Sequence, residues 1–317
     1  MSDCIATILI PTYRRVESLR KQVELLKHFI DLSKIKIIVL DGSDEEASAN
    51  KQICSDISGL EYRHYGSRID VWQRLMVGIH SVTTEIVSIL ADDDFLNPEG
   101  YYESINFLMK NENYSVAAGK YGLYEWINNQ PILIRDTYET PSWDQDSPLE
   151  RLRAMLMTIT TNILFYGVHR SSVLKIAASE ALDNKCAIDQ RSQDLYLACI
   201  SCLMGKVKRT HSFYYGRNSA PNVGGYHTRS MGVFESMPPE SSIIKFIFHP
   251  NFSDRHYALK RTIMKYISYE DEGITFEQAS DFLDESFAQH YTNCFRHELM
   301  HAQGIKKFQK SISQIVN

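Results

Sequence analysis

The chain has 317 residues, of which 44% are hydrophobic and 23% charged, and its formal net charge at pH 7 is −5. This length allows one large hydrophobic core, and the composition is that of an ordinary globular protein. The mildly acidic balance excludes a dedicated nucleic-acid binder, which would carry a basic surface, and no apolar run is long enough to span a membrane.

The cysteines and the N-terminus indicate the compartment. The six cysteines are scattered, mostly in apolar surroundings: Cys4, Cys54, Cys186, Cys199, Cys202 and Cys294. In a chain this long they are typical of reduced core thiols rather than of a disulfide framework. The N-terminus leads almost at once into strand-like residues and shows no signal peptide. We therefore expect a cytoplasmic protein with at most peripheral contact to the inner face of the membrane.

The first ninety residues alternate between strand-like and helix-like segments. Strands are predicted at 5–10, 35–40, 60–64 and 86–90, and the helix before the last of them at about 70–82. This alternation indicates βαβ units and a mostly parallel sheet. In such a sheet a ligand binds beyond the carboxyl ends of the strands.

Polar clusters follow three of these strands. They are Pro11-Thr12-Tyr13, Asp41-Gly42-Ser43 and Asp92-Asp93-Asp94. Three adjacent carboxylates repel one another, and a divalent cation with oxygen ligands would offset that repulsion. Taken alone, the acidic stretch fits a solvated, helix-capping turn equally well. The convergence of the three clusters at one edge of the sheet favours the metal site.

The next forty residues predict a helix and a β-hairpin. The helix is expected at about 98–111, a strand at 114–119, and the hairpin at 121–127 and 131–136. A polar loop bounded by prolines is expected at 137–148.

Further elements follow this loop. A helix is predicted to start near Pro148, a strand to cover 163–168, and another helix to start at Ser171. Gln193-Asp194 is expected to open an apolar helix that Gly205 stops.

The last third of the chain loses the strand–helix alternation. Residues 211–239 are rich in Gly, Pro, His, Arg and Tyr and are expected to be irregular, and the pattern from 241 onward is helical. We place a boundary near residue 238, at the Pro238-Pro239 pair.

Taken together, these segments resemble the GT-A glycosyltransferases, specifically the family-2-like group of bacterial sugar transferases. The matching pieces are Ile10-Pro11-Thr12-Tyr13, Val39-Leu40-Asp41-Gly42-Ser43, Gly78 with the strand into Ala91-Asp92-Asp93-Asp94 and Pro98, and Ser192-Gln193-Asp194-Leu195 before Gly205. They cover residues 5 to about 215. The chain departs from the family pattern at Ala91, where the family's metal motif has an acid, and at Gln193, where the family has Glu.

The resemblance implies an α/β fold of the GT-A (Rossmann-like) type, with a mostly parallel sheet flanked by helices. Residues 1–238 would form the nucleotide-sugar-binding and catalytic domain. Residues 239–317 would form a helical C-terminal extension that serves packing, homo-oligomerisation or the acceptor side.

The resemblance also implies roles for the donor-binding residues. Pro11, Thr12 and Tyr13 would line the nucleotide base, with Arg15 close by. Asp41 would accept a hydrogen bond from a uracil imide or its equivalent. Arg68 would lie near the base or the diphosphate.

The remaining roles concern the metal and the general base of catalysis. Asp93 would ligate the metal when counted back from Pro98, while an Asp-x-Asp habit would favour Asp92 and Asp94, and the choice stays open. Asp92 would otherwise face the donor ribose or sugar, and Asp94 would be a second ligand or an acceptor-side contact. Asp194 would be the general base, although capping alone could explain its position.

A lid is the last part that the residues suggest. His211, Tyr214, Tyr215, Arg217 and the segment 222–229 could close over the diphosphate, with a Gly-Gly hinge. His211 or His227 could complete the metal shell. A plain surface loop is the alternative for each of them.

The implied function is a metal-dependent, inverting glycosyltransferase. With Mn²⁺ or Mg²⁺ as cofactor, it would move a sugar from a nucleotide sugar, first of all a UDP-sugar, to a hydroxyl of a glycan or lipid-linked acceptor in surface polysaccharide synthesis. The cation would neutralise the leaving diphosphate, and a carboxylate would take the proton of the attacking hydroxyl. Direct displacement with a single base inverts the anomeric centre.

Other classes of function remain as alternatives. His297-Glu298-Leu299-Met300-His301 matches the H-E-x-x-H zinc hydrolase pattern, but nothing after His301 is His, Asp or Glu to supply a third ligand. The departure at Ala91 suggests a non-catalytic sugar-nucleotide-binding protein. A nucleotidyltransferase would need a Gly-rich loop after the first strand, where the chain has none.

Overall fold

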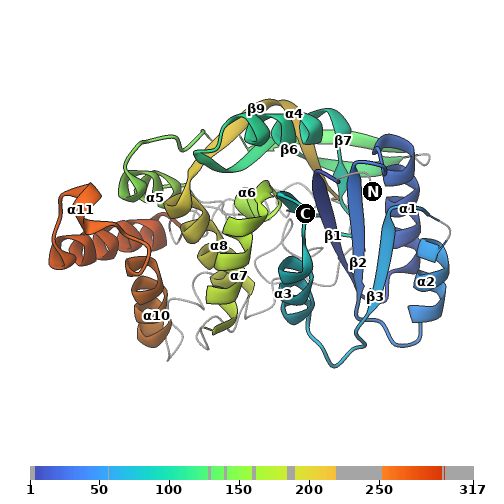
Figure 1. Ribbon diagram of the computed structural model, residues 1–317, viewed down its shortest axis with the longest axis horizontal. Helices are drawn as coiled ribbons and strands as arrows, with labels where there is room; N and C mark the ends of the chain where they lie inside the picture. Colours follow the sequence, from blue (N-terminus) through green and yellow to red (C-terminus); the bar gives the residue numbers. More distant parts are fainter. Residues whose placement is uncertain are drawn as a thin grey trace, which may run out of the picture.

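The computed structural model describes residues 4–55, 57–127, 130–138, 141–158, 162–183, 190–218, 252–294 and 296. Its N-terminal part is built from βαβ units (Figure 1). The elements are β1 (Ala6–Thr12), α1 (Val16–Phe29), β2 (Ile35–Asp41), α2 (Ala47–Ser55), β3 (Leu60–His64), α3 (Val71–Ser81) and β4 (Ile86–Ile89). The four strands lie in the order β3-β2-β1-β4 and all run parallel. The predicted parallel sheet is confirmed in this part of the chain.

The remaining strands extend the same sheet beyond β4. They are β5 (Phe95–Leu96), β6 (Tyr114–Ile127), β7 (Gln130–Tyr138), β8 (Val168–Arg170) and β9 (Lys206–Asn218). Along the sheet the order continues β8-β6-β9-β5, with β7 paired to β6 as the predicted hairpin. Strand β8 is antiparallel to both β4 and β6, whereas β6 and β9 are parallel. The described strands therefore form one mixed sheet.

Helices cover both faces of this sheet. They include α4 (Pro98–Lys110), α5 (Pro148–Leu156), α6 (Asn162–Phe165), α7 (Ser171–Asp183) and α8 (Gln190–Met204). Along β1, Ile8 and Ile10 pack with α1 and α4, while Leu9 packs with α3, α7 and α8. Because alternate strand residues point to opposite faces, this pattern requires a helical layer on each side. The predicted α/β class, with helices flanking the sheet, is confirmed.

Two expectations were wrong. Residues 163–168, expected as a strand, begin in helix α6, and only β8 at Val168–Arg170 is extended. A short apolar run does not distinguish a strand from a buried helix turn, and Leu164 and Phe165 are buried in the helical layer.

The second error concerns residues 211–218, expected as part of an irregular lid. They are the second half of β9, and Tyr214 and Tyr215 are buried there. Their rings stack with other tyrosines. Although this segment is rich in tyrosine, it is therefore a strand that contributes to the core. The rest of the expected lid, 222–229, lies outside the described residues.

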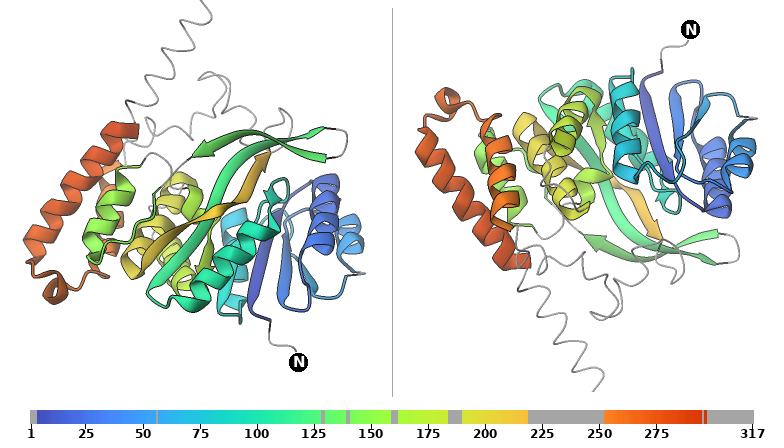
Figure 2. Two further views of the ribbon diagram at one scale, coloured as in Figure 1. Left: turned by 90° about the horizontal axis from the view of Figure 1, so that it is seen from above. Right: turned by 90° about the horizontal axis from the view of Figure 1, so that it is seen from below.

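The helices near the C-terminus pack on the α/β part. They are α10 (Phe252–Met264), α11 (Tyr269–Glu272) and helical residues 276–294. Figure 2 shows these helices beside α5. Ile263 and Phe287 share one hydrophobic core with Leu152 of α5 and Cys199 of α8. The predicted boundary at 238 lies outside the described residues. None of the described helices is long and apolar enough to cross a membrane.

Candidate active site

The register of the parallel strands brings Thr12 beside the acidic turn. Strand β1 pairs with β4 up to Leu9 and Ile89, and the N–H of Leu90 donates to the carbonyl of Leu9. The chain therefore leaves β4 alongside the last residues of β1. There the Thr12 hydroxyl donates a 2.6 Å hydrogen bond to Asp92 Oδ2.

Arg15 joins two of the three acids. Its Nη1 donates to Asp92 Oδ1 at 2.8 Å and to Asp93 Oδ2 at 2.9 Å. The Asp92 carboxylate thus has a partner on each oxygen and is almost fully buried. Burial raises the pKa of Asp92, Arg15 opposes the rise, and the charge of Asp93 adds to it. The positive charge of Arg15 therefore offsets part of the repulsion expected between the three acids.

Asp94 faces away from this pair, toward the end of β9. Its Oδ2 accepts a 2.6 Å hydrogen bond from the Tyr215 hydroxyl, and its Oδ1 accepts one of 3.0 Å from the N–H of Asn218. Burial raises the pKa of Asp94, the charge of Asp93 adds to the rise, and the nearby Arg217 opposes it. Both oxygens of Asp94 are therefore used in holding the acidic turn to β9.

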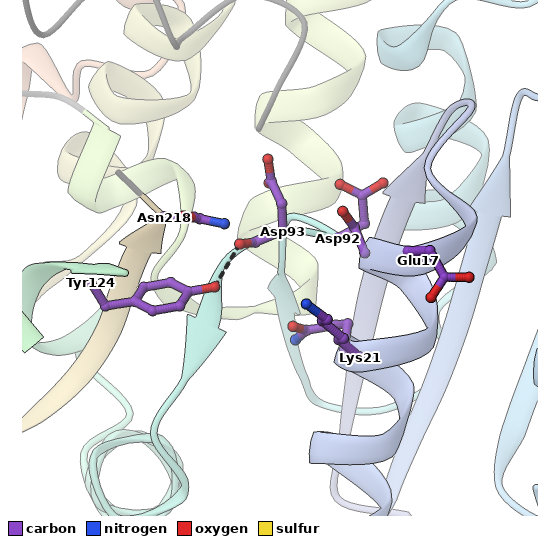
Figure 3. Close-up of a pocket in the computed structure, with 8 residues that line it drawn as sticks. Glu17, Lys21, Asp92, Asp93, Tyr124 and Asn218 are labelled. Carbon is purple, nitrogen blue, oxygen red and sulfur yellow. Dashed lines mark hydrogen bonds between the residues drawn. The ribbon is translucent and has the colours of Figure 1, made fainter. Parts of the chain in front are cut away.

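Asp93 is the most open of the three acids. Its backbone carbonyl accepts a 2.7 Å hydrogen bond from the Tyr124 hydroxyl of β6. Its carboxylate lies at a pocket between α1 and the ends of β6 and β9 (Figure 3). The pocket is lined by Glu17, Ser18, Lys21, Gln22, Asp92, Asp93, Tyr124 and Asn218. Apart from Arg15 at Oδ2, no described residue donates to the Asp93 carboxylate.

These contacts test whether the acids fit a divalent cation. No three His, Cys, Asp or Glu side chains among the described residues are arranged to hold a metal ion together. Asp92 and Asp94 already accept protein hydrogen bonds on both oxygens, whereas Asp93 keeps Oδ1 available. Mg²⁺ is commonly bound by one or two carboxylates, with substrate phosphates and water completing its shell. The residues fit a cation of that kind, and Asp93 is the acid of the three with a carboxylate oxygen left for it.

The expected base-binding residues lie at the same edge with different exposure. Asp41 is fully buried, and its carboxylate accepts hydrogen bonds from the Ser43 N–H, Asn50 Nδ2 and the Tyr62 hydroxyl. It holds the turn after β2 in place. Tyr13 is 41% exposed, and the Arg14 guanidinium lies 5.0 Å from the centre of its ring.

The remaining predicted donor residues are Pro11 and Arg68. Pro11 is half-buried at the end of β1, in register with Leu40 of β2. Arg68 is exposed in the connection between β3 and α3. The structure thus brings the three strand-end clusters to one edge, with Arg68 in a loop beside them.

Asp194 lies farther into its helix than predicted. Helix α8 begins by Gln190, so Asp194 is at least its fifth residue, and helix capping does not explain its position. The helix packs on β6 and β9, and it ends at Met204, two residues before Lys206, which pairs with Tyr114 at the start of β6.

One further predicted metal ligand, His211, is not part of this cluster. His211 is exposed on β9, and its backbone N–H donates a hydrogen bond to Glu103 of α4. His227 lies outside the described residues, as does the segment from His297 to His301.

Sequence reasoning missed two contributors to the site. Tyr124 and Asn218 line the pocket and contact the acidic turn from β6 and β9. Neither carries a motif, and only the pairing of β6 with β9 brings them together, since Tyr124 is in register with Asn218. Tyr215 was expected in a lid and instead binds Asp94 from the core.

Comparisons with known proteins identify one family and several solved structures that are similar to this chain. The sequence model described as "Glycosyl transferase family 2" matches residues 7–170. No curated protein matches the sequence significantly. Among solved structures, that of S. aureus TarS 1-349 in complex with UDP-GlcNAc is similar, with a TM-score of 0.50 and 13% identity over 94% of this chain and 92% of that chain. The same protein in complex with UDP gives a TM-score of 0.49 and 12% identity over 94% and 91%.

Proposed function

We propose, starting from the fact that the chain belongs to glycosyl transferase family 2 and is a glycosyltransferase with a GT-A-type fold, that it uses a UDP-sugar donor and a divalent cation. The family model covers more than half of the 317 residues, which confirms the resemblance seen in the sequence. The transfer of a sugar from a nucleotide sugar follows from that membership. The identity of the donor, the need for a cation, the class of acceptor and the stereochemistry of the transfer are our proposals.

The arrangement of Thr12, Arg15, Asp92 and Asp93 at the strand ends carries the proposal. Thr12 and Arg15 hold Asp92, and Arg15 also reaches Asp93. Asp93 would hold Mg²⁺ or Mn²⁺ through its free oxygen, next to the pocket. When bound, the cation neutralises the charge that develops on the leaving diphosphate. Arg15 lies close enough to orient the same phosphates, because guanidinium groups bind phosphate oxygens well.

The acceptor side of the reaction needs a base. A carboxylate within hydrogen-bond reach of the attacking hydroxyl takes its proton as the new bond forms. Asp194 is our candidate for that base, because it matches the family's general base in the sequence. Direct displacement by this hydroxyl inverts the anomeric centre, and the nucleoside diphosphate leaves without a protein acid.

The donor and acceptor are proposed by class. TarS of S. aureus was solved with UDP-GlcNAc and with UDP, which supports a UDP-sugar as the first donor to test. We propose a hydroxyl of a glycan or lipid-linked glycan as acceptor, in surface polysaccharide synthesis. The reaction would then take place on the cytoplasmic side of the membrane.

Calorimetry with UDP in the presence and absence of Mn²⁺ tests the proposal. Binding should strengthen at least tenfold with Mn²⁺, and Asp93→Asn should remove that gain, because a neutral amide is a weak ligand for a hard cation. Asp144→Asn, at an exposed position, is the matched control and should keep the gain. Equal UDP binding with and without Mn²⁺ would remove the cation from the proposal. GDP and ADP in place of UDP test the choice of base, and donor binding without any transfer to glycan acceptors would favour a non-catalytic binding protein.

A further inference from the structure

The guanidinium of Arg15 contacts the same Asp93 carboxylate that would hold the cation. A single nitrogen, Nη1, serves both carboxylates, at 2.8 Å from Asp92 and 2.9 Å from Asp93. The contact is therefore not the parallel two-nitrogen fork that arginine forms with one carboxylate. Arg15 acts here as a positive charge placed between two acids.

The turn before α1 fixes this position. Arg15 is the residue that precedes α1, and its carbonyl accepts the hydrogen bond from the N–H of Leu19. Arg14 has a left-handed backbone with φ of 56°, and its N–H donates to Ser43 Oγ at 2.8 Å. The turn is thus held by Ser43, which follows β2, on one side and by α1 on the other. The Arg15 side chain crosses from it to the acidic turn and remains partly exposed.

The charges explain why such a contact exists. The Asp92 side chain is 4% exposed and that of Asp93 13%, so two adjacent carboxylates stand in a poorly solvated place. Leaving them without a counter-charge is costly. The partly exposed Arg15 side chain supplies one positive charge, at 27% exposure. A divalent cation on Asp93 supplies two, and it is repelled by a guanidinium at the same carboxylate.

We propose that Arg15 is a positioning residue that competes with the divalent cation for Asp93 and gives way only when the cation arrives with the donor diphosphate. This inference rests on the cation-dependent donor binding proposed above. While Asp93 is free of metal, Arg15 holds the acidic pair in place. When the diphosphate enters, Arg15 exchanges a carboxylate oxygen for phosphate oxygens and keeps a partner. Metal and donor therefore bind cooperatively, and metal alone binds weakly.

Binding of Mn²⁺ in the absence of nucleotide tests the competition directly. Free Mn²⁺ is measured by electron paramagnetic resonance in titrations of the wild type, Arg15→Met and Arg15→Lys. Arg15→Met keeps much of the apolar stem and removes the charge, and it should bind Mn²⁺ about tenfold more tightly, within the usual range of coupling between sites. Arg15→Lys keeps the charge and should remain near the wild type.

The matched control is Arg20→Met, which removes an equal charge from an exposed position on α1 paired with Glu17. It should leave Mn²⁺ binding unchanged. Mn²⁺ binding by Arg15→Met that is equal to or weaker than that of the wild type would overturn the competition.

The same titrations with saturating UDP separate this inference from the proposed function. In the wild type, UDP should increase Mn²⁺ affinity strongly, and Arg15→Met should lose most of that increase. If the wild type binds no Mn²⁺ even with UDP, the cation-dependent function fails and the competition fails with it. If UDP promotes Mn²⁺ binding equally in the wild type and in Arg15→Met, the function stands and the role of Arg15 is refuted.

Discussion

The hydroxyl of Tyr215 donates a 2.6 Å hydrogen bond to Asp94 Oδ2, which ties the end of β9 to the acidic turn after β4. Both side chains are buried, and the Tyr215 ring stacks on Tyr121 and Tyr166. The third acid of the triplet thus has a structural partner deep in the sheet. It fixes the turn from which Asp92 and Asp93 reach Arg15.

Tyr215→Phe should therefore destabilise the protein by about 1.5–3 kcal/mol, because the lost hydrogen bond goes to a buried carboxylate. Urea unfolding at pH 9, where Asp94 is charged despite its raised pKa, measures this free energy. Tyr214→Phe is the matched control, since the Tyr214 hydroxyl donates to the neutral carbonyl of Tyr166 at 2.6 Å. Its loss should be smaller, about 1 kcal/mol. Equal losses for the two variants would show that the charge of Asp94 does not matter to this contact.

Asp194→Asn should retain donor binding and lose transfer. The amide cannot take the proton of the acceptor hydroxyl, and general-base catalysis contributes roughly 10²–10⁴-fold to a rate. Calorimetry with UDP and Mn²⁺ checks binding, and release of UDP from a donor sugar in the presence of acceptor checks transfer. A variant with wild-type kcat would remove Asp194 as the base.

Gly42→Ala should disturb the turn after β2. A Cβ at residue 42 would lie 1.5 Å from Arg74 Nη1, and the Arg74 guanidinium is buried and donates to the carbonyl of Ile69 at 2.9 Å. Overpacking of this kind costs about 1–3 kcal/mol. The double variant with Arg74→Met should recover most of that loss relative to Arg74→Met alone, in a double-mutant cycle followed by urea unfolding. An unchanged loss in the Arg74→Met background would show that the clash is with another group.

His169 should make the stability of the fold depend on pH. It is fully buried on β8, and burial lowers its pKa from 6.5 to about 4. The unfolded chain takes up this proton near pH 6.5 and the folded chain only near pH 4, so stability present above pH 6.5 is lost as the pH falls between these values. At pH 4 the free energy of unfolding is therefore lower by about 3 kcal/mol than it is above pH 6.5.

Urea unfolding of the wild type and His169→Gln between pH 7 and pH 4 checks this dependence. The wild type should lose more stability than the variant over the interval, by about that amount. His28→Gln, at an exposed position on α1, is the control for the removal of a histidine. Parallel stability curves for the wild type and His169→Gln would contradict the prediction.

The order of strands and helices could be read from the sequence to a large extent. The apolar runs of β1, β2 and β4 are buried on both faces of the sheet, and such runs identify strands from local residues alone. The polar ends of the same strands therefore marked the edge of the sheet where the site lies. Helix α6 and the second half of β9 were missed, because their buried positions depend on what packs against them.

The site could be read only in part. The sequence identified Asp92, Asp93 and Asp94 as a group, and three adjacent acids offer no means to distinguish them. In the structure, Asp94 accepts hydrogen bonds from Tyr215 and Asn218, and Asp92 accepts hydrogen bonds from Thr12 and Arg15. Asp93 as metal ligand and Asp194 as base remain predictions.

The sequence by itself determined the α/β class, the parallel strands β1 to β4 and the place of the acidic turn, since strand and helix periodicity and turn residues act over a few positions of the chain. Only the tertiary structure decided which hydrogen-bond donors each acid binds. The partner of Asp92 lies 77 residues away at Arg15, and that of Asp94 lies 121 residues away at Tyr215. A carboxylate takes whichever donor the fold brings within about 3 Å, and no local pattern specifies that donor.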